Sequence, residues 1–197
     1  IVMGILNVTP DSFSDGGRYF AVDQALSRAR AMISEGAGII DVGGESTRPG
    51  ASPVAVSEEL ARTIPVIERL RSEWDGPISI DTSKAAVAEQ ALAAGANIVN
   101  DVSGLRADEE MLGVCIKSDC GIVVMHMQGQ PRTMQTDPRY GDVGVEVREF
   151  FEERYLSLTA SGVEAERLVF DPGIGFGKNL NHNLSLLRRL EKLVVQG

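Results

Sequence analysis

Six short apolar runs, separated by segments with helical spacing, constrain the fold of this chain more than any other feature of its sequence. Within each run the apolar residues are consecutive rather than alternate, which is typical of strands buried on both faces. Strands that alternate with helices in this way predict an α/β fold with a parallel sheet and right-handed crossovers. The runs occupy residues 1–7, 38–42, 77–81, 97–101, 121–126 and 168–171.

Several helix boundaries are predicted by residues that favour helix ends. Ser83 is expected to cap the third helix, and Gly95 is expected to end it. Asn181 or Asn183 is expected to cap the last helix. Pro65 falls inside the second helix and is expected to kink it. The expected helices cover roughly residues 22–33, 60–74, 84–94, 108–118, 144–160 and 183–194.

The charge balance argues against some classes of partner. The chain has 19 basic and 28 acidic residues and a net charge of −9, which disfavours non-specific binding to nucleic acid or to an anionic membrane. No apolar run approaches the length of a membrane span, and no segment reads as a signal peptide. Cys115 and Cys120 match no metal or redox motif, so we expect two reduced thiols in a cytoplasmic protein.

Each of the six runs has a polar residue at its end or one position before it. In a parallel (β/α)8 barrel all these ends open on the face where active sites lie, whereas an open doubly wound sheet uses a crevice between two strands. Polar ends on every strand favour the barrel. Two long polar stretches, 8–20 and 43–56, follow the first two runs and are expected to act as lids. The polar ends are Asn7, Asp41, Asp81, Asn100 with Asp101 beside it, His126 and Asp171.

The stretch "LVFDPGIGFGK" at 168–178 looks at first like a phosphate-binding loop. A Walker loop needs four residues between its first glycine and Gly-Lys, and then Ser or Thr. Here only three residues separate Gly173 from Gly177, and Asn179 follows Lys178. The spacing G-x-G-x-G also fails the dinucleotide pattern G-x-G-x-x-G. We therefore expect the glycines to let the backbone turn over a flat ligand, with Asp171 pointing into the barrel mouth.

Five motifs together resemble the dihydropteroate synthase family in order and spacing, and they span nearly the whole chain. The resemblance implies a (β/α)8 TIM barrel of folate biosynthesis. Such enzymes condense 4-aminobenzoate with (7,8-dihydropterin-6-yl)methyl diphosphate, giving 7,8-dihydropteroate and diphosphate. They use Mg²⁺, are commonly homodimers and are the target of sulfonamides. The motifs are "MGILNVTPDSFSDGG" (3–17), "DVGGESTRPGA" (41–51), "IDTSK" (80–84), "NDVSG" (100–104) and "DPGIGFGK" (171–178).

The resemblance implies a pterin site at the strand ends. Asp81, Asn100 and Asp171 would be the catalytic residues and would also bind the pterin. A carboxylate suits pterin binding because its two oxygens can accept hydrogen bonds from the amino group and the adjacent ring N–H of a pterin. The resemblance assigns this contact to Asp171. Met125 and Phe176 would form walls against the ring faces. The expected mechanism is dissociative: diphosphate leaves, the pterin spreads the positive charge, and the amine then attacks.

The resemblance also assigns the diphosphate and 4-aminobenzoate contacts. Asn7 would hold Mg²⁺, which accepts a single amide oxygen alongside phosphate and water oxygens. Thr47 would contact the pterin diphosphate, and both Thr47 and Arg48 would contact 4-aminobenzoate. Phe13 and Pro49, on the two long stretches, would close over the 4-aminobenzoate ring.

Only six strand–helix units are present, whereas an eight-fold barrel needs two more. We therefore expect residues 1–197 to form a single pterin-binding barrel domain that is truncated at its C-terminus, with units seven and eight absent. The homodimer is expected of the full-length chain.

Two alternatives share the polar strand ends. One is a corrinoid methyltransferase domain that binds methyltetrahydrofolate, and the other is a non-catalytic pterin-binding barrel. Neither should need the stretches "TPDSFSDGG" (9–17) and "ESTRPGA" (45–51), which are intact here. Their presence favours the synthase.

Overall fold

The computed structural model describes residues 1–8, 18–46, 52–130 and 133–195. The strands are β1 (Met3–Asn7), β2 (Ile39–Gly43), β3 (Ile78–Asp81), β4 (Ile98–Asp101), β5 (Gly121–Met125) and β6 (Leu168–Asp171). They form one parallel sheet in the order β1-β2-β3-β4-β5-β6. A doubly wound sheet would reverse its order at a switch point. The sequential order is that of a barrel wall, so the predicted α/β fold is confirmed.

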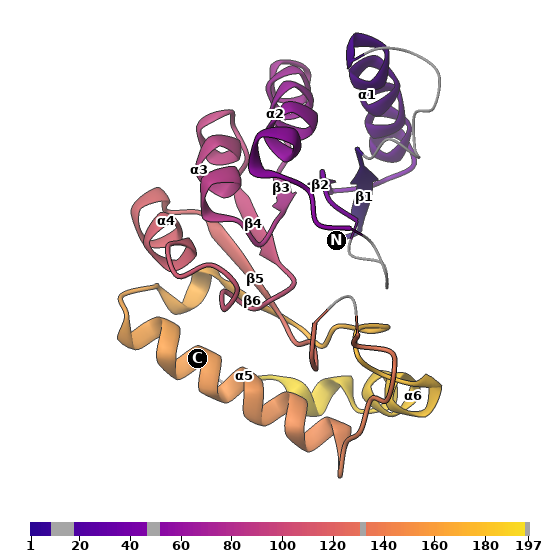
Figure 1. Cartoon of the computed structure of the whole chain (residues 1–197), viewed down its shortest axis with the longest axis vertical. Coiled ribbons are helices and arrows are strands. Elements are labelled where there is room, and N and C mark those ends of the chain that lie inside the picture. Colours follow the sequence, from indigo (N-terminus) through magenta and orange to yellow (C-terminus); the bar gives the residue numbers. More distant parts are fainter. Residues whose placement is uncertain (9–17, 47–51, 131–132, 196–197) are drawn as a thin grey trace.

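The helices α1 to α5 lie in an arc along one side of the strands (Figure 1). The second helix passes through Pro65 as one continuous element, and Gly95 follows the third helix with a positive φ of 113°, as its predicted end requires.

Among the described residues, no helix combines the length and the apolar character needed to cross a membrane. The helices are α1 (Arg18–Ser34), α2 (Val56–Glu73), α3 (Ala85–Ala93), α4 (Met111–Ser118), α5 (Val143–Ala160) and α6 (Leu180–Arg188), with short 3-10 turns η2 (Ala165–Arg167) and η3 (Leu190–Leu193).

The main core lies between the helices and the outer face of the sheet. Ile40, Ile78 and Ile80 are fully buried in one cluster with helix residues such as Leu26 and Leu70. Each buried aliphatic side chain of this size contributes about 1.5–3 kcal/mol. Asp41 and Ser79 lie between such apolar positions, so they point to the opposite, inner face. Both side chains are buried, so at these positions the strands are covered on both faces, as expected.

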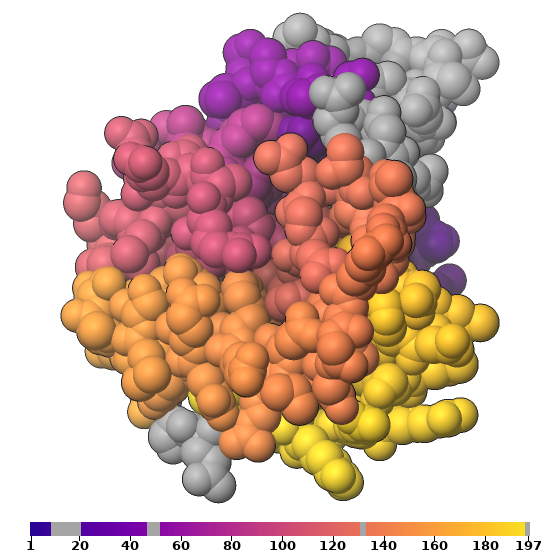
Figure 2. Space-filling model, turned by 60° about the horizontal axis from the view of Figure 1, so that its bottom comes forward, coloured from indigo at the N-terminus to yellow at the C-terminus, as the bar shows by residue number. Residues whose placement is uncertain are grey.

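A second cluster joins the last two helices. Val147 and Phe151 of α5 pack with Leu186 of α6 and Leu193 of η3, and all four are buried. Figure 2 shows the orange α5 region and the yellow C-terminal segments side by side on one surface. This cluster fixes the segment that follows β6 against the helix that precedes it.

Two predicted helix caps are wrong. Ser83 does not cap α3; the N-cap position is Lys84, and the Ala85 N–H donates instead to the Asp108 carboxylate at 2.8 Å. The fourth helix begins at Met111 rather than near 108, and the Asp108 carbonyl accepts from the Met111 N–H at 3.1 Å. The last helix starts earlier than expected, at Leu180, with Asn179 as its cap. The start of α3 therefore uses an acceptor that is distant along the chain. The last helix uses an asparagine that precedes both of the predicted ones.

The Asn179 cap can be tested against the predicted one. The Asn179 side chain accepts from the His182 N–H at 2.9 Å and forms a reciprocal capping box. We expect Asn179→Ala to lower the free energy of unfolding by about 0.5–2 kcal/mol. Asn181→Ala serves as the matched control and should have little effect, since Asn181 is exposed inside the first turn. Chemical denaturation checks this, and a larger loss for Asn181→Ala would contradict it.

Candidate functional site

The register of the sheet places the predicted pterin residues on one face. Asn7 pairs with Gly43, Gly43 with Asp81, and Asp81 with Asn100. Paired residues of neighbouring parallel strands point to the same side, so these side chains share the inner face at one level. Met125 pairs with Asp171, one level nearer the strand ends. Phe176 packs in a small hydrophobic cluster with Met125.

The remaining predicted positions fall in two groups. Phe13, Thr47, Arg48 and Pro49 lie outside the described residues. The other strand-end residues, Asp101 and His126, do not join the inner face. The buried Asp101 carboxylate accepts hydrogen bonds from the Ser103 and Leu105 N–H groups at 2.8 and 3.0 Å, so it shapes a turn. β5 ends at Met125, and His126 follows it.

Gly43 leaves open the space between Asn7 and Asp81. A Cβ at Gly43 would lie 3.4 Å from Asp81 Oδ2 and 3.7 Å from Asn7 Oδ1. The amide oxygen of Asn7 and the Asp81 carboxylate therefore flank one position that only a glycine leaves unfilled. Oxygen atoms in this arrangement suit a hard cation or hydrogen-bond donors of a ligand.

A buried carboxylate, Asp41, fixes the amide of Asn100. The Asn100 Nδ2 group donates to Asp41 Oδ2 at 3.1 Å, and Asp41 is only 2% exposed. Burial raises the pKa of Asp41, and the hydrogen bond from Asn100 opposes that rise. Asp41 thus uses one of the two N–H groups of the Asn100 amide. Asp41 is recognisable in the sequence as a strand end, but this contact depends on the pairing of β2 with β3 and of β3 with β4.

Asp81 lies in a cluster of acidic groups. Burial raises its pKa well above the ordinary range, and the charges of Asp41 and Asp101 raise it further. A carboxylate held in this way is stabilised by any cationic or donor group that binds beside it. Perturbed carboxylates of this kind occur preferentially at functional sites.

The loop after β6 packs directly on the chain that follows β5. Gly173 has φ +64°, and a Cβ there would lie 2.1 Å from the His126 carbonyl oxygen. Gly177 has φ +62°, and its Cβ would lie 2.6 Å from the Gln128 carbonyl oxygen. The Gly173 N–H also donates to Asp171 Oδ1 at 2.8 Å. The glycines therefore serve a close backbone contact, and the expectation that they turn over a flat ligand is not needed to explain them.

A buried ion network anchors the stretch after β2. Lys84 pairs with both Glu45 and the fully buried Glu59, and Thr82 donates to Glu59 at 2.7 Å. Burial alone would lower the pKa of Lys84, but the hydrogen bonds and charges of the two glutamates raise it. Arg62 holds the Gly44 carbonyl at 2.6 Å. These contacts fix the chain immediately before residues 47–51.

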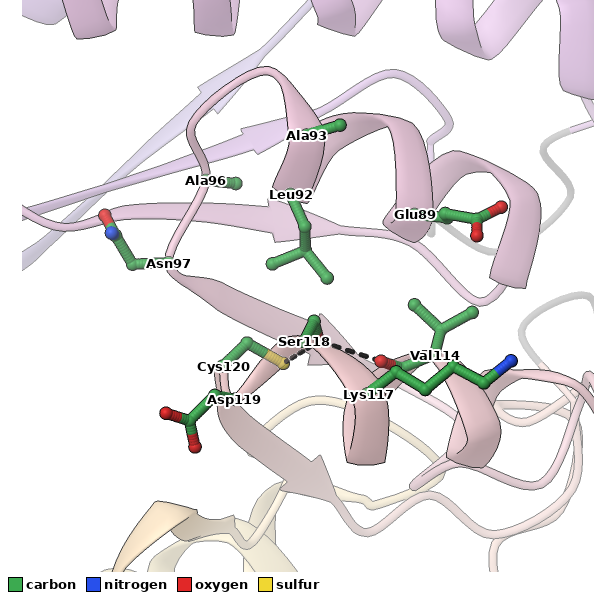
Figure 3. A pocket seen from close by; sticks show the side chains of 10 residues that line it. All are labelled: Glu89, Leu92, Ala93, Ala96, Asn97, Val114, Lys117, Ser118, Asp119 and Cys120. Atoms are coloured by element: carbon green, nitrogen blue, oxygen red, sulfur yellow. Dashed lines mark hydrogen bonds between the residues drawn. The ribbon is translucent and has the colours of Figure 1, made fainter.

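A separate pocket of about 440 Å³ lies at the opposite ends of the strands, between α3 and α4 (Figure 3). Asn97 and Cys120, which line it, directly precede β4 and β5. The Ser118 hydroxyl contacts Cys120 Sγ at 3.4 Å there. Both cysteines are free and buried, as expected. The predicted active-site residues lie at the other ends of the strands, so this pocket is not their site.

Comparison with known proteins identifies the family of this chain. The family described as pterin binding enzyme matches residues 3–197. A dihydropteroate synthase from Synechocystis is 51% identical over 192 residues, which cover 98% of this chain and 66% of the relative. The chain belongs to the dihydropteroate synthase family.

Solved structures of other members of the dihydropteroate synthase family superimpose closely. The Yersinia pestis enzyme, in a sulfonamide drug complex, has a TM-score of 0.91 and 49% identity, covering 98% of this chain and 70% of that one. The Burkholderia cenocepacia enzyme, complexed with 7,8-dihydropteroate, has a TM-score of 0.86 and 48% identity, covering 98% and 65%. The chain thus spans about two thirds of the length of its relatives.

The acidic cluster predicts a particular pH dependence of stability. Because the pKa of Asp81 is raised in the folded chain, the native state binds its proton more tightly than the unfolded state. Stability therefore falls as the pH rises from about 4 through that raised pKa. We expect Asp81→Asn to raise the melting temperature at pH 7 and to make its decline between pH 4 and 7 shallower. Calorimetry checks this against Asp75→Asn, an exposed control; equal pH profiles for all three proteins would contradict it.

Proposed function

We propose that this chain carries the pterin and diphosphate sites of a dihydropteroate synthase. The proposed reaction is the condensation of 4-aminobenzoate with (7,8-dihydropterin-6-yl)methyl diphosphate, which releases diphosphate. The observation that carries the proposal is the placement of Asn7, Asp81, Asn100 and Asp171 on one face of the sheet, in a chain whose relatives are dihydropteroate synthases. Residues 1–197 would form one pterin-binding domain of a cytoplasmic, homodimeric enzyme.

In the proposed mechanism the carboxylates bind the pterin and stabilise charge. Asp171 accepts hydrogen bonds from the pterin amino group and ring N–H, and Asp81 and Asn100 contact other edges of the ring. Met125 and Phe176 lie together and would cover a ring face. As the bond to diphosphate breaks, positive charge develops on the pterin methylene, and the acidic cluster around Asp81 is placed to stabilise it. The amine of 4-aminobenzoate then forms the new C–N bond and loses a proton.

The residues present fit a Mg²⁺ ion of the expected kind. Among the described residues no group of three or more His, Cys, Asp or Glu side chains could hold a metal by itself. Mg²⁺ needs no such group, because it keeps several waters and takes one or two protein oxygens beside phosphate oxygens. Asn7 Oδ1, at the open space over Gly43, would supply one of them. When bound, the ion would neutralise charge on the departing diphosphate.

Diphosphate release measured with and without 4-aminobenzoate tests the proposed function. We expect release that depends on 4-aminobenzoate and yields 7,8-dihydropteroate. Methyl transfer from methyltetrahydrofolate would identify the corrinoid methyltransferase instead. Pterin binding with no turnover in the full-length protein would identify a binding barrel.

Replacing Asp171 tests the pterin contact. Asp171→Ala removes a charge-assisted, two-point acceptor, so we expect pterin binding to weaken by about 2–4 kcal/mol. Asp171→Asn should also weaken it, because an amide N–H would face a pterin N–H. Isothermal titration measures both, with Asp75→Asn as the exposed control. Unchanged affinity in either variant would show that Asp171 has another role.

Filling the space over Gly43 tests the diphosphate and Mg²⁺ side of the site. The added Cβ of Gly43→Ala would meet its neighbours at ordinary contact distances, so the fold should tolerate it. The methyl group would occupy the position between Asn7 and Asp81, and we expect binding of the pterin diphosphate with Mg²⁺ to weaken about tenfold or more, or about 1.4 kcal/mol. Gly113→Ala on α4 is the control, since nothing lies within 4 Å of its Cβ. Equal affinities for the two variants would rule out a ligand at this position.

A further inference from the structure

We propose that Lys178 and His126 are positioning residues for the pterin site. Together they hold the loop 172–177 against the chain that follows β5, and they thereby set the places of Asp171, Met125 and Phe176. The identity of the ligand rests on the proposed function. The positioning itself rests on contacts within the chain.

The ammonium group of Lys178 has an acceptor for each of its N–H donors. It contacts His126 Nδ1 at 3.0 Å, the His126 carbonyl at 3.2 Å and the Phe176 carbonyl at 2.9 Å. An ammonium has three N–H groups and no lone pair, so these contacts use its full hydrogen-bonding capacity. Lys178 is only 2% exposed. The lysine that gives the stretch its likeness to a phosphate loop is therefore turned inward and is committed to protein acceptors.

His126 can accept from Lys178 because its ring is neutral. Burial lowers the pKa of His126 to about 3, and the charges of Lys178 and Arg106 act in the same direction. A neutral imidazole with its proton on Nε2 presents Nδ1 as an acceptor. The ring is held edge-on against Phe150 of α5, with centroids 5.0 Å apart. The acceptor is therefore fixed by the packing of a helix and not by the loop that it holds.

His126 connects the two strand ends that form the pterin walls. It directly follows Met125, and its N–H donates to the Asp171 carbonyl at 2.9 Å. Its own carbonyl receives Lys178 and also meets the backbone at Gly173, where no Cβ would fit. A second tie closes the far end of the loop, since the Tyr140 hydroxyl donates to the Gly177 carbonyl at 2.9 Å. The loop is thus fixed at Gly173, Phe176 and Gly177.

The buried charge of Lys178 does not stabilise the fold. Burial lowers its pKa to about 8, although the charge of Asp171 opposes this effect. A lysine whose pKa is lowered by folding binds its proton less tightly in the folded chain than in the unfolded chain. Its burial in the charged form at neutral pH therefore lowers the free energy of unfolding. Buried polar groups of this kind can supply a defined conformation at a cost in stability. The contribution expected of Lys178 is therefore the position of the loop.

Replacing Lys178 with an apolar side chain of similar length separates position from stability. In Lys178→Met we expect faster hydrogen exchange at the amides of residues 173–177 and at least tenfold weaker binding of pteroic acid, with a melting temperature within about 4 °C of the parent. Lys117→Met, at an exposed position on α4, is the matched control. Loop exchange and affinity equal to those of the parent would overturn the proposal. The proposal would also be overturned if the loss of affinity were fully accounted for by the fraction of the variant that is unfolded.

Two substitutions of His126 provide a second test if Lys178→Met does not fold. His126→Asn can place an amide oxygen near the position of Nδ1, whereas His126→Leu cannot accept from Lys178. We expect the asparagine variant to keep most of the affinity for pteroic acid and the leucine variant to lose it, with faster loop exchange only in the latter. Equal behaviour of the two variants would overturn the role of the Lys178 contact. If the parent itself failed to bind pteroic acid, the proposed function would fail, while the exchange rates would still decide the positioning.

Discussion

The site depends on the alternation of side chains along parallel strands that are paired in a fixed register. A strand sends successive side chains to opposite faces, so Ile40 and Val42 enter the core while Asp41 points inward. Because Gly43, Asp81 and Asn100 are paired residues, their positions align across three strands. A slip of one residue in any strand would move its polar end into the helix-facing core. The burial of the outer face therefore holds the polar inner face in place.

This inner face gathers acidic groups that favour a ligand with donors or positive charge. Asp41 and Asp81 both have raised pKa values, chiefly because burial disfavours their charged forms. The arrangement costs stability in the free chain, as expected of a site prepared for a ligand. Two lysines of the described part of the chain are committed to other groups: Lys84 to two glutamates, and Lys178 to His126 and Phe176. The pterin of the proposed function, with its adjacent N–H donors, would meet this acidic surface with a complementary pattern.

The loop after β6 shows how a familiar sequence pattern can take a different physical role. Its glycines allow two backbone segments to approach until a side chain at Gly173 would overlap the His126 carbonyl. Its lysine then ties the same carbonyl to the loop. The spacing of the glycines was sufficient to reject a Walker loop. It contained no information about the partner, because His126 lies in a strand–loop junction distant along the chain.

The sequence by itself determined the alternation of strands and helices, and with it the parallel sheet, because burial and helical spacing are local patterns. It also predicted a site at Asn7, Asp81, Asn100 and Asp171, because polar strand ends and the family motifs coincide there. The roles of Asp41, Lys84 and Lys178 needed the tertiary structure, since each acts on a group from another strand or helix. The failed cap at Ser83 has the same cause: Asp108, from a later loop, satisfies the N–H at the start of α3. Local propensity predicts elements, whereas hydrogen bonds between distant segments decide which polar groups remain available for a ligand.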